Sequence, residues 1–168
     1  MRIETERLII TKFTTDMAEA VHLGSIDDDN RRFVPDEVFE TAEEALETIE
    51  FLISVYETND GPLVYPILLR DNTYIGYIQA VPMGDGTYEL GYHISQEFRG
   101  KGYATEAVKV FLPVIMNSLN LTEILGVCVA ENLASATVME KCGFAPIFEG
   151  LDIYQGTERA VKKYIYKI

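Results

Sequence analysis

The sequence predicts an α/β fold, in which a mixed sheet is covered by helices on both faces. Residues 63–69 and 73–81 are apolar runs joined by turn residues, which is typical of a hairpin and requires antiparallel neighbours. Residues 88–129 read as a strand, a glycine-rich turn, an amphipathic helix and a second apolar strand. That order predicts two parallel strands with a right-handed crossover. The length of 168 residues favours one domain covering residues 1–168.

The other elements follow from shorter patterns, and the predicted order is β-α-α-β-β-β-α-β-α-β-β. A capping box of Thr41 and Glu44 starts a helix that ends before the turn residues at 59–62. The unbroken apolar run at 124–129 is typical of a strand buried on both faces. Further elements are predicted as a strand at 7–13, helices at 15–23 and 132–142, and a strand at 160–168.

Composition excludes several classes of protein. The net charge is −13, whereas nucleic-acid binding relies on clustered Lys and Arg, so we expect no nucleic-acid partner. No apolar run reaches the roughly 20 residues that span a bilayer, and the N-terminus does not resemble a signal peptide, so we expect no membrane partner. Two cysteines, Cys128 and Cys142, have no metal-ligand spacing. We therefore expect a cytoplasmic protein without a metal.

The turn before the central helix has the composition of a phosphate-binding loop. Residues 99–104 read Arg-Gly-Lys-Gly-Tyr-Ala, between a strand and a helix. Glycines let the backbone approach a ligand closely, and a helix N-terminus offers N–H donors and the positive end of a dipole. A Walker-type loop requires Ser or Thr after Gly-Lys, but Gly102 follows Lys101 here. A diphosphate group is the expected ligand.

These residues resemble the GNAT superfamily of N-acetyltransferases, whose cofactor loop reads Gln/Arg-x-x-Gly-x-Gly/Ala. Arg99, Gly102 and Ala104 match that pattern, and a second motif at 132–144 is also similar. Residues 4–8 and 91–94 resemble the branch named for ribosomal-protein alanine acetyltransferases. The resemblance covers nearly the whole chain and implies an acetyl-CoA-dependent N-acetyltransferase with a GNAT-like fold.

The resemblance also implies how acetyl-CoA is bound. Two central strands separate, and the pantetheine arm lies between them like an added strand, paired with the backbone near Ile94. Asn132 is expected to bond the pantetheine arm, to cap the following helix, or to do both. The residues expected to bind the cofactor are Ile94, Arg99, Gly100, Lys101, Gly102, Tyr103, Ala104, Thr105 and Asn132.

The catalytic groups are less well marked by the sequence. The family attacks the thioester directly with the amine, and its usual thiolate acid is a Tyr at the position that is Met139 here. Ser135 is the nearest hydroxyl in that motif and is the alternative proton donor. Glu89 or His93, on one face of a strand, is the candidate base.

The acceptor cannot be named from the sequence, but its charge can be predicted. Twelve acids and two bases lie between Asp27 and Asp60, and the acids at 27–40 fall in a segment expected to be loop-like. We expect a cationic amine acceptor, such as a peptide N-terminus or a polyamine, attracted by these charges. A solvated helix face is the plainer explanation for Glu43, Glu47 and Glu50. A non-catalytic acyl-CoA-binding module, favoured by Met139, is the alternative function, and a homodimer is possible.

Overall fold

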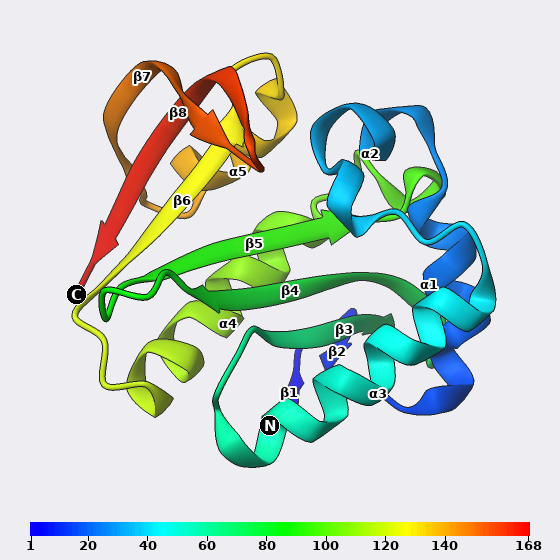
Figure 1. The fold of residues 1–168 in the computed structure, drawn as a ribbon. Helices are drawn as coiled ribbons and strands as arrows, with labels where there is room; N and C mark the ends of the chain where they lie inside the picture. Colours follow the sequence, from blue (N-terminus) through cyan, green and yellow to red (C-terminus); the bar gives the residue numbers. More distant parts are fainter.

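The structure is a computed structural model that describes residues 1–168, and it contains an eight-stranded mixed sheet. The strand order is β1-β2-β3-β4-β5-β6-β8-β7, in which only β5 and β6 run parallel (Figure 1). The strands are β1 (Ile3–Glu4), β2 (Leu8–Ile10), β3 (Leu63–Leu69), β4 (Tyr74–Pro82), β5 (Tyr88–Ile94), β6 (Glu123–Val129), β7 (Ala145–Tyr154) and β8 (Thr157–Lys167).

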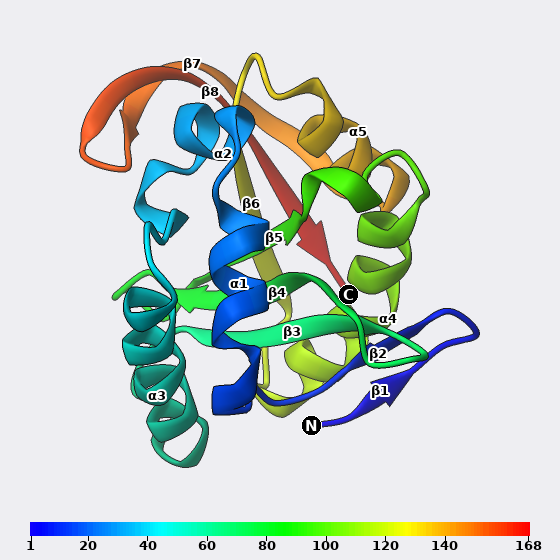
Figure 2. The same ribbon diagram turned by 90° about the vertical axis from the view of Figure 1, so that its right-hand side faces the viewer.

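Helices cover both faces of the sheet (Figure 2). The helices are α1 (Ala18–Ser25), α2 (Asp28–Phe33), α3 (Ala42–Thr58), α4 (Tyr103–Ser118) and α5 (Leu133–Lys141). The larger core lies between the sheet and α4 and α5, and the smaller one lies under α1 and α3. Strand alternation divides the side chains between them: Leu8 and Ile10 enter the larger core, and Ile9 enters the smaller one. No helix is both long enough and apolar enough to cross a membrane.

The predicted mixed α/β fold and the parallel crossover are confirmed, with differences at the N-terminal end. A short strand, β1, was not predicted, and the strand at 7–13 is shorter than expected. The capping box at Thr41 is present in a modified form. Thr41 accepts from the Glu44 N–H at 3.2 Å, whereas the Glu44 carboxylate accepts from the N–H of Glu40 at 2.8 Å.

The segment 27–40, expected to be loop-like, is partly helical, so that prediction was wrong for residues 28–33 and 35–37. Residues 28–33 form α2, and a 3₁₀ turn at Pro35–Glu37 follows. Asp27 caps α2, because its carboxylate accepts from the N–H of Asn30 at 2.8 Å. The sequence lacks the apolar periodicity of a longer helix here, so contacts with the rest of the protein must hold this short helix in place.

The parallel strands β5 and β6 separate along their length. Their pairing is limited to Glu89 with Leu125 and Leu90 with Gly126, whereas β4 and β5 remain paired from Gly76 and Ile94 to the far end. A wedge therefore opens beside residues 91–94. The prediction that β6 is buried on both faces was wrong for one face, because Leu125, Val127 and Val129 are only half-buried.

Candidate active site

The glycine loop presents free N–H groups at the start of α4. Gly100 and Gly102 have φ angles of 74° and 81°, in the left-handed region that favours glycine. The N–H groups of residues 100–105 donate to no acceptor in the protein, while the Glu106 N–H begins the helical pattern by donating to Gly102. This backbone fits a diphosphate group, because it offers several donors together at a helix N-terminus.

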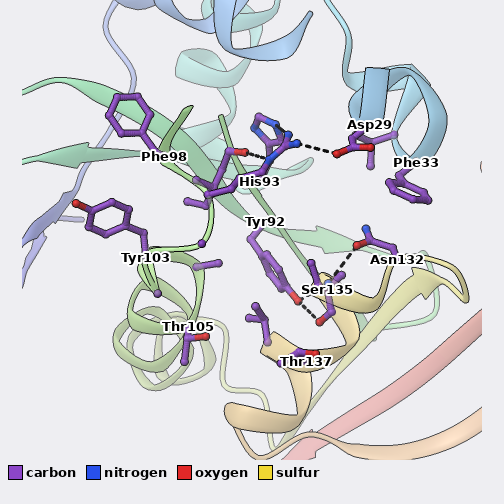
Figure 3. A pocket seen from close by; sticks show the side chains of 18 of the residues that line it. Asp29, Phe33, Tyr92, His93, Phe98, Tyr103, Thr105, Asn132, Ser135 and Thr137 are labelled. Atoms are coloured by element: carbon purple, nitrogen blue, oxygen red, sulfur yellow. Dashed lines mark hydrogen bonds and ion pairs between the residues drawn. The ribbon is translucent and has the colours of Figure 1, made fainter. Parts of the chain in front are cut away.

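A cavity of about 450 Å³ lies in front of this loop. It is bounded by α2, the end of β5, the loop and α5, with Tyr103 and Thr105 on one side and Asn132 and Ser135 on the other (Figure 3). Gly100, Gly102 and Ala104 also line it. Lys101 does not line the cavity, and its ammonium lies over the ring of Phe98, 5.7 Å from the centroid. We call this the cofactor cavity.

The open edge of β5 adds further donors and acceptors. The Ser95 N–H donates to the Ile75 carbonyl of β4, and hydrogen bonds alternate along an antiparallel pair. The N–H and C=O groups of Tyr92 and Ile94 therefore point toward β6, where no β6 residue pairs with them. The Ile94 carbonyl is already used, since it accepts from Arg99 Nε at 2.8 Å. The Ile94 N–H and both groups of Tyr92 remain open.

Arg99 begins the loop, but its side chain turns away from the diphosphate position. Its guanidinium pairs with Asp27 at 3.0 Å and with Asp29 at 3.2 Å, and it also contacts Asn30 at 3.3 Å. Asp27 and Asn30 are largely buried, so the guanidinium neutralises charge in a poorly solvated place. Arg99 therefore ties α2 to the start of the cofactor loop.

Asn132 caps α5, as one of the two predicted roles requires. Its Oδ1 accepts from the N–H of Ser135 at 3.2 Å. Its side chain also lies at the wall of the cofactor cavity (Figure 3). The amide NH₂ can therefore reach a ligand there while the oxygen serves the helix.

A second cavity, of about 440 Å³, opens on the other side of the wedge, and we call it the acceptor cavity after the role proposed for it below. Its lining includes Glu89 of β5 and two of the half-buried residues of β6, Val127 and Val129. Burial raises the pKa of Glu89 to about 7, and the nearby Glu37 carboxylate adds to this, while Lys163 opposes it. Glu89 can therefore take up and release a proton near neutral pH.

His93 is placed less favourably for catalysis. Its ring stacks on Tyr77 with the centroids 5.4 Å apart, and Nε2 lies 3.4 Å from an Arg99 nitrogen. Burial lowers the pKa of His93 to about 4, and the Arg99 charge adds to this. His93 lines the cofactor cavity and not the acceptor cavity, so the structure separates it from Glu89.

The hydroxyl of Ser135 lies where the two cavities meet. Tyr92 Oη donates to the Ser135 carbonyl at 2.8 Å and lies 3.1 Å from Ser135 Oγ (Figure 3). Burial raises the pKa of Tyr92, so its phenol stays protonated. Met139, one turn further along α5, is buried against Gly126 of β6. Tyr92 of β5 thus places a phenol beside Ser135 of α5. No pattern in the sequence predicted this contact.

The acids at 27–40 are used differently from the expectation. Asp27 and Asp29 pair with Arg99, and Glu40 pairs with Arg31, so their charges are largely neutralised. Glu37 instead lies in the acceptor cavity. No pattern in the sequence distinguished it from its acidic neighbours.

Cys128 and Cys142 are buried, and burial raises both thiol pKa values, which leaves them unreactive.

Comparison with known proteins identifies the family. Residues 7–145 match the acetyltransferase (GNAT) domain. The chain is 32% identical over 145 residues to the Bacillus subtilis protein YnaD, described as an uncharacterized N-acetyltransferase, covering 85% of this chain and 82% of that protein. The chain belongs to the GNAT acetyltransferase family. It is accordingly an acetyl-CoA-dependent N-acetyltransferase and not merely an acyl-CoA-binding module.

Solved structures of GNAT proteins share the whole fold. A GNAT-family acetyltransferase from Bacillus anthracis is 28% identical, with a TM-score of 0.82 over 99% of this chain and 98% of that one. RimL, a ribosomal L7/L12 α-N-protein acetyltransferase solved with coenzyme A, is 16% identical, with a TM-score of 0.84 over 100% and 98% of the two chains. At that identity the likeness to RimL concerns the fold alone.

Proposed function

We propose that this GNAT enzyme acetylates the primary amine of a cationic acceptor by direct attack within a ternary complex. The observation that supports this most is that the two cavities share five lining residues at the wedge: Phe33, Val34, Tyr92, Asn132 and Ser135. A donor in one cavity and an acceptor in the other can therefore meet without a covalent enzyme intermediate. The buried, unactivated cysteines agree with this route.

Backbone groups would hold acetyl-CoA, which supplies the activated thioester. The free N–H groups of residues 100–105 would bind the diphosphate, and the open groups of Tyr92 and Ile94 would pair with the pantetheine arm. Asn132 would use its amide NH₂ on the same arm. The developing charge on the acetyl oxygen would be stabilised by a β5 N–H in the wedge, from Tyr92 or Ile94.

Glu89 would remove the proton from the acceptor ammonium, directly or through a water molecule. A pKa near 7 keeps much of this carboxyl ionised at neutral pH, while it is still basic enough to accept a proton. Ser135 would donate a proton to the departing thiolate, with Tyr92 Oη hydrogen-bonded beside it to position the hydroxyl.

The direct test is acetylation of an amine panel, measured as release of the free thiol of coenzyme A. We expect release only when an amine is present, and we expect Glu89→Gln to slow it at saturating acetyl-CoA while leaving coenzyme A binding intact. Glu97→Gln, a change of the same kind outside both cavities, is the matched control. Thiol release at the same rate with and without an amine would overturn the proposed acetylation. An unaltered rate of thiol release in Glu89→Gln would overturn the role of Glu89 as the base.

A further inference from the structure

Besides Glu89 and the exposed Asp36, the acceptor cavity contains a third carboxylate, Glu37, that the reaction itself does not require. Glu37 lies in the 3₁₀ turn after α2, and its side chain reaches over β4. Tyr77 Oη donates to one carboxylate oxygen, and Gln79 Nε2 donates to the other at 3.0 Å. Two β4 side chains thus hold the carboxylate in a fixed orientation against the sheet.

Gly91 of β5 makes this arrangement possible. It pairs across the sheet with Gln79, and a Cβ built on Gly91 would lie 2.6 Å from Gln79 Nε2. The side chain of Gln79 therefore packs directly over Gly91, and from there its amide donates to Glu37. Three separate elements contribute to placing one carboxylate, which would be a costly arrangement for a group with no function.

No cationic side chain of the cavity pairs with Glu37, and burial raises the pKa of its carboxyl to about 7, so it is partly protonated until a cation binds. Both of its donors are neutral side chains, and the cavity lining includes the acids Asp36, Glu37 and Glu89 but no Lys, Arg or His. The remaining walls are mainly apolar, with Val81, Val127, Val129 and Ile153 among them. A ligand that complements this cavity carries positive charge at separate points joined by an apolar segment.

We propose that the acceptor is a small molecule with two ammonium groups, such as an alkyl diamine, and that Glu37 binds the group that does not react. The inference rests on the proposed function, because Glu89 is taken to deprotonate the other amine. The methylene chain would lie along the valine-lined wall between the two carboxyl groups. Glu37 is thus the specificity-determining residue of the acceptor cavity.

The test compares alkyl diamines with monoamines of the same length, for example 1,4-diaminobutane with butylamine. A charge-assisted hydrogen bond in a poorly solvated cavity predicts a kcat/KM about 10- to 100-fold higher for the diamine. Glu37→Gln should remove this preference by lowering the diamine value and leaving the monoamine value within about threefold of wild type. Calorimetry should show the same loss in diamine affinity, independently of turnover.

Asp28→Asn is the matched control, because it removes one negative charge from an exposed position in the same segment without reaching the cavity. It should retain the full diamine preference. Equal kcat/KM for the mono- and diamine in wild type would overturn the inference, as would an equal loss for both in Glu37→Gln. A peptide N-terminus preferred over every diamine would also overturn it. All three results would leave amine acetylation standing, whereas amine-independent thiol release would refute the proposed function itself.

Discussion

Replacing Arg99 with alanine should destabilise the protein and weaken both substrate sites. The guanidinium makes polar contacts with Asp27, Asp29, Asn30 and the Ile94 carbonyl. Only 9% of the Asp27 side chain is exposed, so Arg99→Ala leaves a carboxylate with little solvent to replace its partner. Its remaining hydrogen bond, from the Asn30 N–H, does not neutralise the charge.

The size of the effect follows from these contacts. Breaking a fully buried ion pair costs about 3–5 kcal/mol, and the 31% exposure of the Arg99 side chain reduces this to about 3 kcal/mol. For a chain of this length, each kcal/mol lowers Tm by about 2–4 °C, so Arg99→Ala should melt about 6–12 °C below wild type. The Tm of Arg99→Lys should lie between those of Arg99→Ala and wild type, because one ammonium cannot contact all the partners of the guanidinium at once.

Thermal and denaturant unfolding of a double-mutant cycle with Asp27→Asn measures the pair. Asparagine still caps a helix, so the Asp27→Asn change removes the charge but keeps α2 capped. The double variant should therefore be more stable than the sum of the two single effects predicts, by about 1–2 kcal/mol. Because Phe33 at the end of α2 and Val34 directly after it line both cavities, Arg99→Ala should also raise KM for acetyl-CoA and for the amine.

Two results would refute this reasoning. One is a Tm for Arg99→Ala within about 2 °C of wild type, which would mean that the guanidinium contributes little to stability. The other is strict additivity in the cycle, which would mean that Arg99 and Asp27 do not interact. A raised KM for acetyl-CoA with an unchanged Tm would instead assign Arg99 a direct contact with the cofactor.

Other variants test the remaining assignments. Gly102→Glu should abolish coenzyme A binding by calorimetry, whereas Gly84→Glu, at a similar φ of 86° in an exposed turn, should bind normally; binding by both would refute the diphosphate site. Ser135→Ala should lower kcat about tenfold or more with a smaller change in KM, and Tyr92→Phe should lower kcat less; an unchanged kcat in Ser135→Ala would exclude the proton donor. The logarithm of kcat/KM should rise with pH and level off above about 7, as Glu89 and Glu37 ionise, because burial raises the pKa of each to about 7. Glu89 has a raised folded-state pKa, so the folded protein binds more protons and loses stability as pH rises from about 4.5 to about 7. Glu89→Gln should therefore be more stable than wild type at pH 8, by about 3 kcal/mol, and equal stability there would contradict the raised pKa.

Local patterns in the sequence predicted much of the fold. The glycine loop, the hairpin at 70–72 and the Asn132 cap depend on residues close together in the chain, and all three are present. α2 was missed because its stability depends on a tether from Arg99, about 70 residues away. Short helices without an apolar stripe have no local pattern by which to recognise them.

In the candidate site, too, features that depend on neighbouring residues in the chain could be predicted, and features that depend on distant partners could not. The backbone loop for the cofactor could be predicted, because glycines before a helix act through local geometry. The side-chain directions of Arg99 and Glu37 could not, since each is set by partners on other elements. The apolar run of β6 also misled, because a valine facing a cavity and a valine facing the core look alike in a sequence.

The two cavities differ in which part of the chain would contact the ligand. On the proposed placement, acetyl-CoA is recognised mostly by main-chain groups, which persist when side chains are replaced, provided that the loop glycines remain. The acceptor instead meets side chains, of which Glu37, Gln79 and Ile153 come from three different elements. Substitutions on that side can change the amine that is accepted without disturbing the acetyl donor. The scaffold is therefore free to evolve new acceptor preferences at a constant cofactor, a few side chains at a time.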